Sequence, residues 1–140
     1  MVAAFRYWAT LVFVAVVVEV GFAGYGAFYV ARKIDKSSEP KGTTEKVWDH
    51  GFGAHAGFGY VVVLGGLVLL VLALLAADRR SRAKRPAVLA GLLILQVLLA
   101  GFGSDVPAIG FFHPVNALLI FALSGLIAHQ AWHGRKPAAP

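Results

Sequence analysis

The chain has 140 residues, of which 59% are hydrophobic and only 14% are charged. A soluble globular domain carries about 25% charged residues, and a disordered chain needs low hydrophobicity, so the composition excludes both classes. The sequence contains no cysteine, which excludes disulfides, thiolate metal sites and cysteine nucleophiles. Its five histidines are therefore the main candidates for metal or redox chemistry.

Four apolar stretches reach the roughly 20 residues that a helix needs to cross a bilayer. They cover residues 7–31, 51–77, 86–104 and 106–134. The first stretch is too long for the apolar core of a secretory signal, so we expect it to remain part of the protein. The sequence thus predicts an all-α, integral membrane four-helix bundle that forms a single domain over residues 1–140.

Basic residues indicate how the helices are oriented. The connection between the second and third stretches, DRRSRAKRP, is strongly basic, and Arg6, Arg135 and Lys136 lie near the chain ends. All of them fall on one side if the four spans alternate, and the positive-inside rule makes that side cytoplasmic. We therefore expect an inner (plasma) membrane protein with both termini in the cytoplasm, and a loop at residues 32–50 facing outward. The basic connection is interpreted as a topology and lipid-contact signal, and no nucleic acid is expected as a partner.

The first and third stretches contain similar segments, EVGFAGYG beginning at Glu19 and QVLLAGFG beginning at Gln96. Four of the eight positions are identical, and the polar residue Glu19 is matched by Gln96. Each segment is followed by an apolar helix with a histidine near its outer end, His55 or His113. Parallel repeats of this kind recur in membrane proteins, so we expect the bundle to be built from two repeated helical hairpins.

His55 and His113 are expected at similar depth on helices that face each other across the bundle. Ionisable side chains within a membrane are energetically unfavourable and usually face a partner or a cavity. Two opposed imidazoles about 4 Å apart at their ligating nitrogens provide an axial pair for haem b. Gly59 and Ala117, four positions after each histidine, would let a flat porphyrin approach the backbone. In the alternative interpretation, each histidine lies at the interface, hydrogen-bonded to a loop carbonyl.

The other histidines have less distinctive surroundings. His129 and His133 are spaced i, i+4 near the expected cytoplasmic end, and we interpret them as interfacial residues together with Trp132. A zinc ion at the outer histidine pair would need further ligands. His50 could supply one, but we favour haem over zinc.

Glu19 lies near the expected bilayer midplane, at a level that Gln96 shares in the other half of the repeat. Two interpretations of this pair stay open. Glu19 could be a protonated carboxyl group that bonds Gln96 and holds two helices together. Alternatively, the two residues could handle protons or a quinone.

The segment QVLLAG at Gln96, a short outer loop and His113 at the head of an apolar helix resemble one four-helix half of haem A synthase, a cytochrome b-like bundle. His55 and Gly59 on the second stretch strengthen this resemblance. Haem A synthase is built from two fused four-helix bundles, each with a histidine pair on its second and fourth helices. The resemblance implies that His55 and His113 are axial ligands of haem, and that a two-haem arrangement would need a dimer or a partner. The chain also looks like an uncharacterised family of small four-span bacterial membrane proteins.

The sequence therefore predicts a membrane protein that binds haem b near the outer face through two histidines and serves electron transfer or haem-dependent redox chemistry. A redox partner or a second copy of the chain is the expected protein partner. Two alternatives remain: a cofactor-free structural or assembly subunit, and a small quinone- or proton-handling protein that uses Glu19 and Gln96. Whether the protein is an enzyme stays open.

Overall fold

A computed structural model of the chain describes residues 2–36, 42–76 and 83–133. The described chain is helical, and four of its helices are long, as predicted. The elements in order are α1 (Val2–Lys36), α2 (Gly42–Leu74), α4 (Lys84–Asp105), the single turn α5 (Pro107–Gly110) and α6 (Phe112–His133). Four segments are long and apolar enough to cross a membrane: Ala3–Ile34, Glu45–Leu74, Lys84–Asp105 and Pro107–His133.

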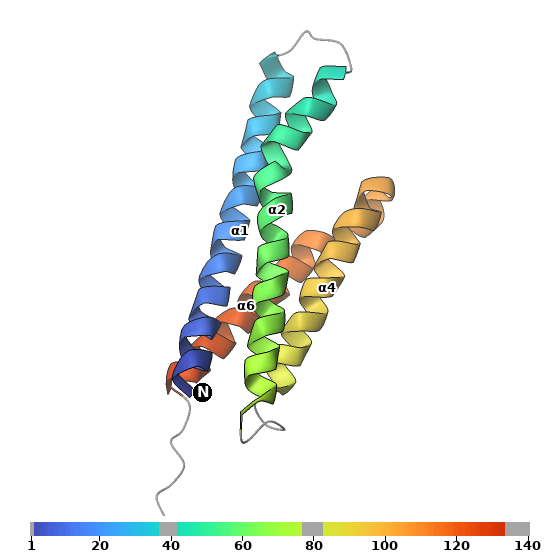
Figure 1. The fold of residues 1–140 in the computed structure, drawn as a ribbon. Coiled ribbons are helices and arrows are strands. Elements are labelled where there is room, and N and C mark those ends of the chain that lie inside the picture. The colour runs from blue at the N-terminus through green and yellow to red at the C-terminus, as the bar shows by residue number, and fades with distance from the viewer. Residues whose placement is uncertain (1, 37–41, 77–82, 134–140) are drawn as a thin grey trace, which may run out of the picture.

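The four long helices form a ring in which each packs against two neighbours. Helix α1 packs against α2 and α6, and α4 packs against the same two helices (Figure 1). Across the described residues, neither diagonal pair, α1 with α4 or α2 with α6, comes into close backbone contact. Side chains that point inward from α2 and α6 can therefore meet only at the centre of the bundle.

Most of the tightly packed core lies in the half of the bundle nearest the start of α1 and the end of α2. The buried apolar side chains recur every three, four or seven residues, which places them on one face of each helix. They are Ala9, Val12 and Val16 of α1, Val62 and Leu69 of α2, Leu89 and Leu93 of α4, and Ile120, Ile127 and Ala128 of α6. Large apolar residues are exposed on the outer surface, for example Phe28 and Leu118. Such a surface is compatible with contact with lipid.

The prediction of a loop at residues 32–50 was wrong for residues 32–36 and 42–50, and residues 37–41 lie outside the described part. Helix α1 continues to Lys36, and α2 already begins at Gly42 and includes His50. Helix-breaking residues occur here only at Pro40 and Gly42, whereas the polar residues around them are compatible with helix. The two helices therefore extend as a hairpin beyond α4 and α6 (Figure 1).

Two other boundaries differ from the prediction. The first helix begins at Val2 rather than at residue 7, and the second helix ends at Leu74. The predicted ends of the second and fourth spans, residues 77 and 134, lie outside the described residues. The fourth span consists of α5 and α6, which are separated at Phe111. Val106 adopts an extended conformation before Pro107, so α4 ends and α5 begins there. A β-carbon on Gly103 would lie only 2.6 Å from the Cα atom of Gly110, so this turn depends on two glycines in close approach.

Basic and aromatic side chains gather at the end where α1 begins and α6 ends. The Arg6 guanidinium lies 5.9 Å from the centre of the Trp132 ring, and Trp132 donates a 2.9 Å hydrogen bond from Nε1 to Thr10 Oγ1. Arg85 donates from Nη1 to Gln130 Oε1 at 2.6 Å. The start of α4 thus lies at the same end of the bundle as the start of α1 and the end of α6. Residues 77–82 of the basic connection, and Arg135 and Lys136, lie outside the described part.

A candidate histidine site at the centre of the bundle

His55 of α2 and His113 of α6 meet across the bundle. The centres of their imidazole rings are 6.1 Å apart and the ring planes are inclined at 85°. Because α2 and α6 are diagonal neighbours, this contact passes through the centre of the helical ring. The two histidines singled out in the sequence therefore lie together in the structure.

Glu19 of α1 is the polar neighbour of His55. The distance from His55 Nδ1 to Glu19 Oε1 is 2.8 Å, and the two side chains are 24% and 17% exposed. The carboxyl oxygen lies off the line of the N–H bond, since Nδ1 has no aligned acceptor. A small rotation of either side chain would turn this contact into a hydrogen bond.

Gly59 makes room for the Glu19 carboxyl group. A β-carbon at Gly59 would lie 3.0 Å from Glu19 Oε1, closer than ordinary van der Waals contact. The space that the sequence analysis reserved for a porphyrin at Gly59 therefore holds the Glu19 side chain. Ala117, its counterpart on α6, is partly buried.

Gln96 of α4 engages both ring nitrogens of His113. The distance from His113 Nδ1 to the backbone oxygen of Gln96 is 3.2 Å, and His113 Nε2 lies 3.1 Å from Gln96 Nε2. A carbonyl oxygen can only accept, so Nδ1 carries the proton. The lone pair on Nε2 then accepts a hydrogen bond from the amide of Gln96. This assignment defines the tautomer of His113.

Asn116, which the sequence analysis missed, completes the polar cluster. It is 4% exposed, and its Nδ2 donates to Gln96 Oε1 at 2.7 Å and to Leu92 O at 2.9 Å. Its Oδ1 is buried without a hydrogen-bond partner. The available signal was an asparagine in an apolar span, three residues after His113, because polar side chains in spans commonly bond neighbouring helices.

The expected hydrogen bond between Glu19 and Gln96 does not form among the described residues. Glu19 contacts His55, whereas Gln96 contacts His113 and Asn116. The reason is the packing order of the helices: α1 and α4 are diagonal and have no close backbone contact in the part described. Each polar residue therefore contacts the histidine of the adjacent helix.

The remaining histidines lie apart from this cluster. His129 and His133 stack with ring centres 4.5 Å apart, and His133 Nδ1 lies 3.0 Å from the backbone oxygen of His129. The His50 ring packs against Tyr29 at 5.2 Å. Within residues 2–36, 42–76 and 83–133, no three histidine, aspartate or glutamate side chains are grouped as a metal site.

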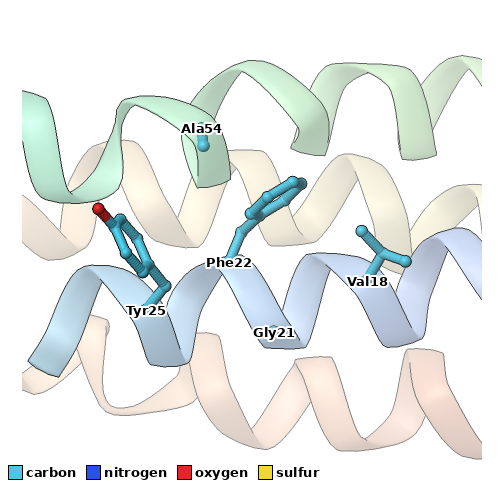
Figure 2. Close-up of a pocket in the computed structure, with 5 residues that line it drawn as sticks. All are labelled: Val18, Gly21, Phe22, Tyr25 and Ala54. Atoms are coloured by element: carbon cyan, nitrogen blue, oxygen red, sulfur yellow. The ribbon is translucent and has the colours of Figure 1, made fainter.

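An open apolar groove lies on the outer surface between α1 and α2 (Figure 2). Phe22 points towards α2, and its ring packs edge-on against Phe58 with ring centres 5.4 Å apart. The residues that line the groove are Val18, Gly21, Phe22, Tyr25 and Ala54. The groove has the character of a lipid-facing surface.

Comparison with known proteins leaves the family of the chain open. No protein-family model, no curated protein and no solved structure matches it. The resemblance to one half of haem A synthase therefore stays a prediction.

Proposed function

We propose that this chain binds one b-type haem through His55 and His113 and serves electron transfer or haem-dependent redox chemistry. The observation that carries the proposal is the 6.1 Å between the two ring centres. Two iron–nitrogen bonds of about 2 Å, with about 1.1 Å from each nitrogen to its ring centre, add up to roughly 6 Å. The separation would suit two imidazoles that share one iron once His113 Nε2, which lies 3.1 Å from the amide nitrogen of Gln96, turns towards His55.

The groups that lie beside Nδ1 of each imidazole ring also fit an iron site. A metal-ligating histidine usually donates its other ring N–H to a carboxylate or a backbone carbonyl. Here Nδ1 of His55 lies beside Glu19 Oε1, and Nδ1 of His113 lies beside the backbone oxygen of Gln96. This arrangement would make Nε2 the ligating atom of each ring, and on His113 that atom would first have to leave the amide of Gln96, 3.1 Å away.

The position of the two histidines in the bundle also supports the proposal. They lie on the diagonal helices, outside the half that holds most of the buried core. Ala117 is a small residue four positions after His113, whereas the space at its counterpart Gly59 holds the Glu19 side chain. The haem would contribute one-electron chemistry at a potential set by its ligands and surroundings. The protein would contribute the two imidazoles and the tautomer of His113.

The contacts of the polar residues support the proposed repeat of two hairpins. Glu19 contacts His55, and Gln96, at the equivalent position, contacts His113. We further propose that the four helices insert in the inner membrane with the basic end cytoplasmic, in accordance with the positive-inside rule. The histidine site then lies towards the outer face.

An absorption spectrum tests haem binding. The protein is expressed with ample haem, purified in detergent and recorded as a reduced-minus-oxidised difference. We expect a b-type spectrum that disappears in the double variant His55→Ala/His113→Ala. The matched control, His129→Ala/His133→Ala, removes two imidazoles from the other end of α6 and should leave the spectrum unchanged.

A colourless wild-type preparation would contradict the proposal. It would favour the cofactor-free alternative, in which Gln96 and Asn116 join α4 to α6 and Glu19 joins α1 to α2 as interhelical polar contacts. Membrane insertion and a single gel-filtration peak for each variant show that loss of colour is not loss of fold.

A further inference from the structure

The open groove between α1 and α2 leads along α1 to aromatic and then to basic side chains. Resting on the membrane insertion proposed above, and on no part of the haem argument, we propose that the hairpin of α1 and α2 binds one anionic phospholipid. One acyl chain lies in the groove, and the phosphate group lies beside Arg32 and Lys33.

The groove has room for a narrow apolar chain. It is lined by Val18, Gly21, Phe22 and Tyr25 of α1 and by Ala54 of α2, and the Tyr25 hydroxyl group is the one polar group of these side chains (Figure 2). From Val18 to Tyr25 it runs about 10 Å along α1, at 1.5 Å per residue. A β-carbon at Gly21 would meet no atom within 4 Å, so the groove is open at this position. An elongated apolar ligand fits such a surface.

The depth of the groove matches one leaflet of a bilayer. Arg6 and Trp132 contact each other at the basic end, and such basic and aromatic side chains mark a membrane interface. A hydrocarbon core of about 30 Å takes roughly 20 helical residues, so the opposite interface falls near Ala27 of α1. The groove, from Val18 to Tyr25, therefore lies at the depth of the acyl chains of the adjacent leaflet. This depth is the same whichever end of the bundle faces the cytoplasm.

The side chains beyond the groove suit a lipid headgroup. Val18, Tyr25 and Arg32 follow one another at steps of seven residues, close to two helical turns, so they share one side of α1. Lys33 Nζ lies 5.7 Å from the centre of the Tyr29 ring, and Arg32 and Lys33 are both exposed. The order along α1 is thus apolar groove, aromatic rings and cations. A phospholipid presents acyl chain, glycerol and phosphate in the same order.

The acidic residues at the start of α2 do not offset this charge at the groove. Glu45 and Asp49 precede Ala54 by nine and five residues, which turns them by roughly 180° and 140° from it around the helix. Because Ala54 lines the groove, both carboxyl groups lie on the other side of α2. Among the side chains that the structure describes, neither Arg32 nor Lys33 forms an ion pair. Both cations can therefore bind a phosphate group.

Native mass spectrometry of the full chain in detergent, titrated with single lipids, tests the groove. We expect one phosphatidylglycerol molecule to bind more tightly than phosphatidylcholine does. Gly21→Leu places a side chain in the groove and should lower the affinity for phosphatidylglycerol about tenfold, because the contacts of several methylene groups are lost. Gly101→Leu is the matched control, since Gly101 of α4 is also exposed and has open space at its β-carbon. Equal affinities of the two variants would overturn the proposal.

Two charge variants test the headgroup contacts. Arg32→Gln and Lys33→Gln should each lower the affinity for phosphatidylglycerol about fivefold, the effect of one basic side chain near an anionic membrane surface. The weaker affinity for phosphatidylcholine should not change. Lys46→Gln removes the same charge from an exposed position in the first turns of α2 and should leave both affinities unchanged. Wild-type affinity for phosphatidylglycerol in Arg32→Gln and Lys33→Gln would refute the proposal.

Other results separate this proposal from its rivals. If Gly21→Leu changes the oligomeric state in detergent and leaves lipid binding intact, a second copy of the chain occupies the groove and the proposal is wrong. A chain that carbonate extracts from membranes would contradict the proposed insertion and the lipid site together. An inserted chain that binds both lipids equally would contradict the lipid site alone. The haem spectrum is independent of all these outcomes.

Discussion

A β-carbon at Gly59 would lie 3.0 Å from Oε1 of Glu19, so the carboxyl group lies directly over the backbone of α2. This close approach lets Glu19, on the neighbouring helix α1, reach His55 one turn away. Gly59 is thus a positioning residue for the carboxyl group, and its role can be separated from that of other glycines on the same helix.

Gly59→Ala should displace the Glu19 carboxyl group. Haem affinity should then fall about tenfold, because His55 loses the carboxyl group that lies beside its Nδ1. Gly57→Ala is the control, since a β-carbon at Gly57 meets no atom within 4 Å. Haem titration of the purified apoprotein provides the measurement. In a Glu19→Ala background the effect of Gly59→Ala should largely vanish; additive effects of the two changes would argue against this coupling.

Glu19→Gln keeps the size of the side chain and replaces the carboxyl group by an amide. We expect haem affinity to fall about 10- to 100-fold, the range found for partners of metal-bound histidines. The rate of haem transfer to a scavenger protein measures this loss. Glu45→Gln changes an exposed carboxyl group in the first turn of α2 and should have no effect. If both variants release haem at the wild-type rate, Glu19 does not support His55.

Asn116→Leu should lower the free energy of unfolding by about 1 kcal/mol, because polar side-chain bonds between membrane helices contribute about 0.6 to 1.7 kcal/mol each. It removes the donor to Gln96 and to Leu92 O and puts an apolar side chain of similar size in its place. Ser124→Ala is the matched control on α6. Ser124 is equally buried, but it bonds only Phe121 O within its own helix. Equal stabilities of the two variants in a dodecyl sulfate unfolding titration would contradict the expectation.

The absence of cysteine allows the orientation to be tested with single introduced thiols. Asp105→Cys, at the end of α4, should react with a membrane-impermeant maleimide in intact cells. Lys84→Cys, at the start of the same helix, should react only after the membrane is permeabilised. Both positions are exposed on the protein. The reverse labelling pattern would show that the basic end faces outward.

The sequence by itself determined the all-α fold class and the number of long helices. In hydrocarbon, every backbone polar group must be satisfied within its own segment, so a 20-residue apolar stretch has essentially one conformation open to it. The histidine pair was also visible in the sequence, because His55 and His113 each interrupt an apolar span that follows one of the matched polar residues Glu19 and Gln96. Their proximity in space could therefore be predicted before any coordinates.

Only the tertiary structure decided which polar groups bond each other. Glu19 and Gln96 match in the sequence, but they lie on diagonal helices, so each contacts the histidine of the adjacent helix. The role of Asn116 in joining α6 to α4 is visible only in the structure, where its Nδ2 donates hydrogen bonds to two acceptors on α4. Apolar periodicity specifies which segments are helices but not their order around the bundle, because in lipid that order depends on side-chain packing and interhelical hydrogen bonds.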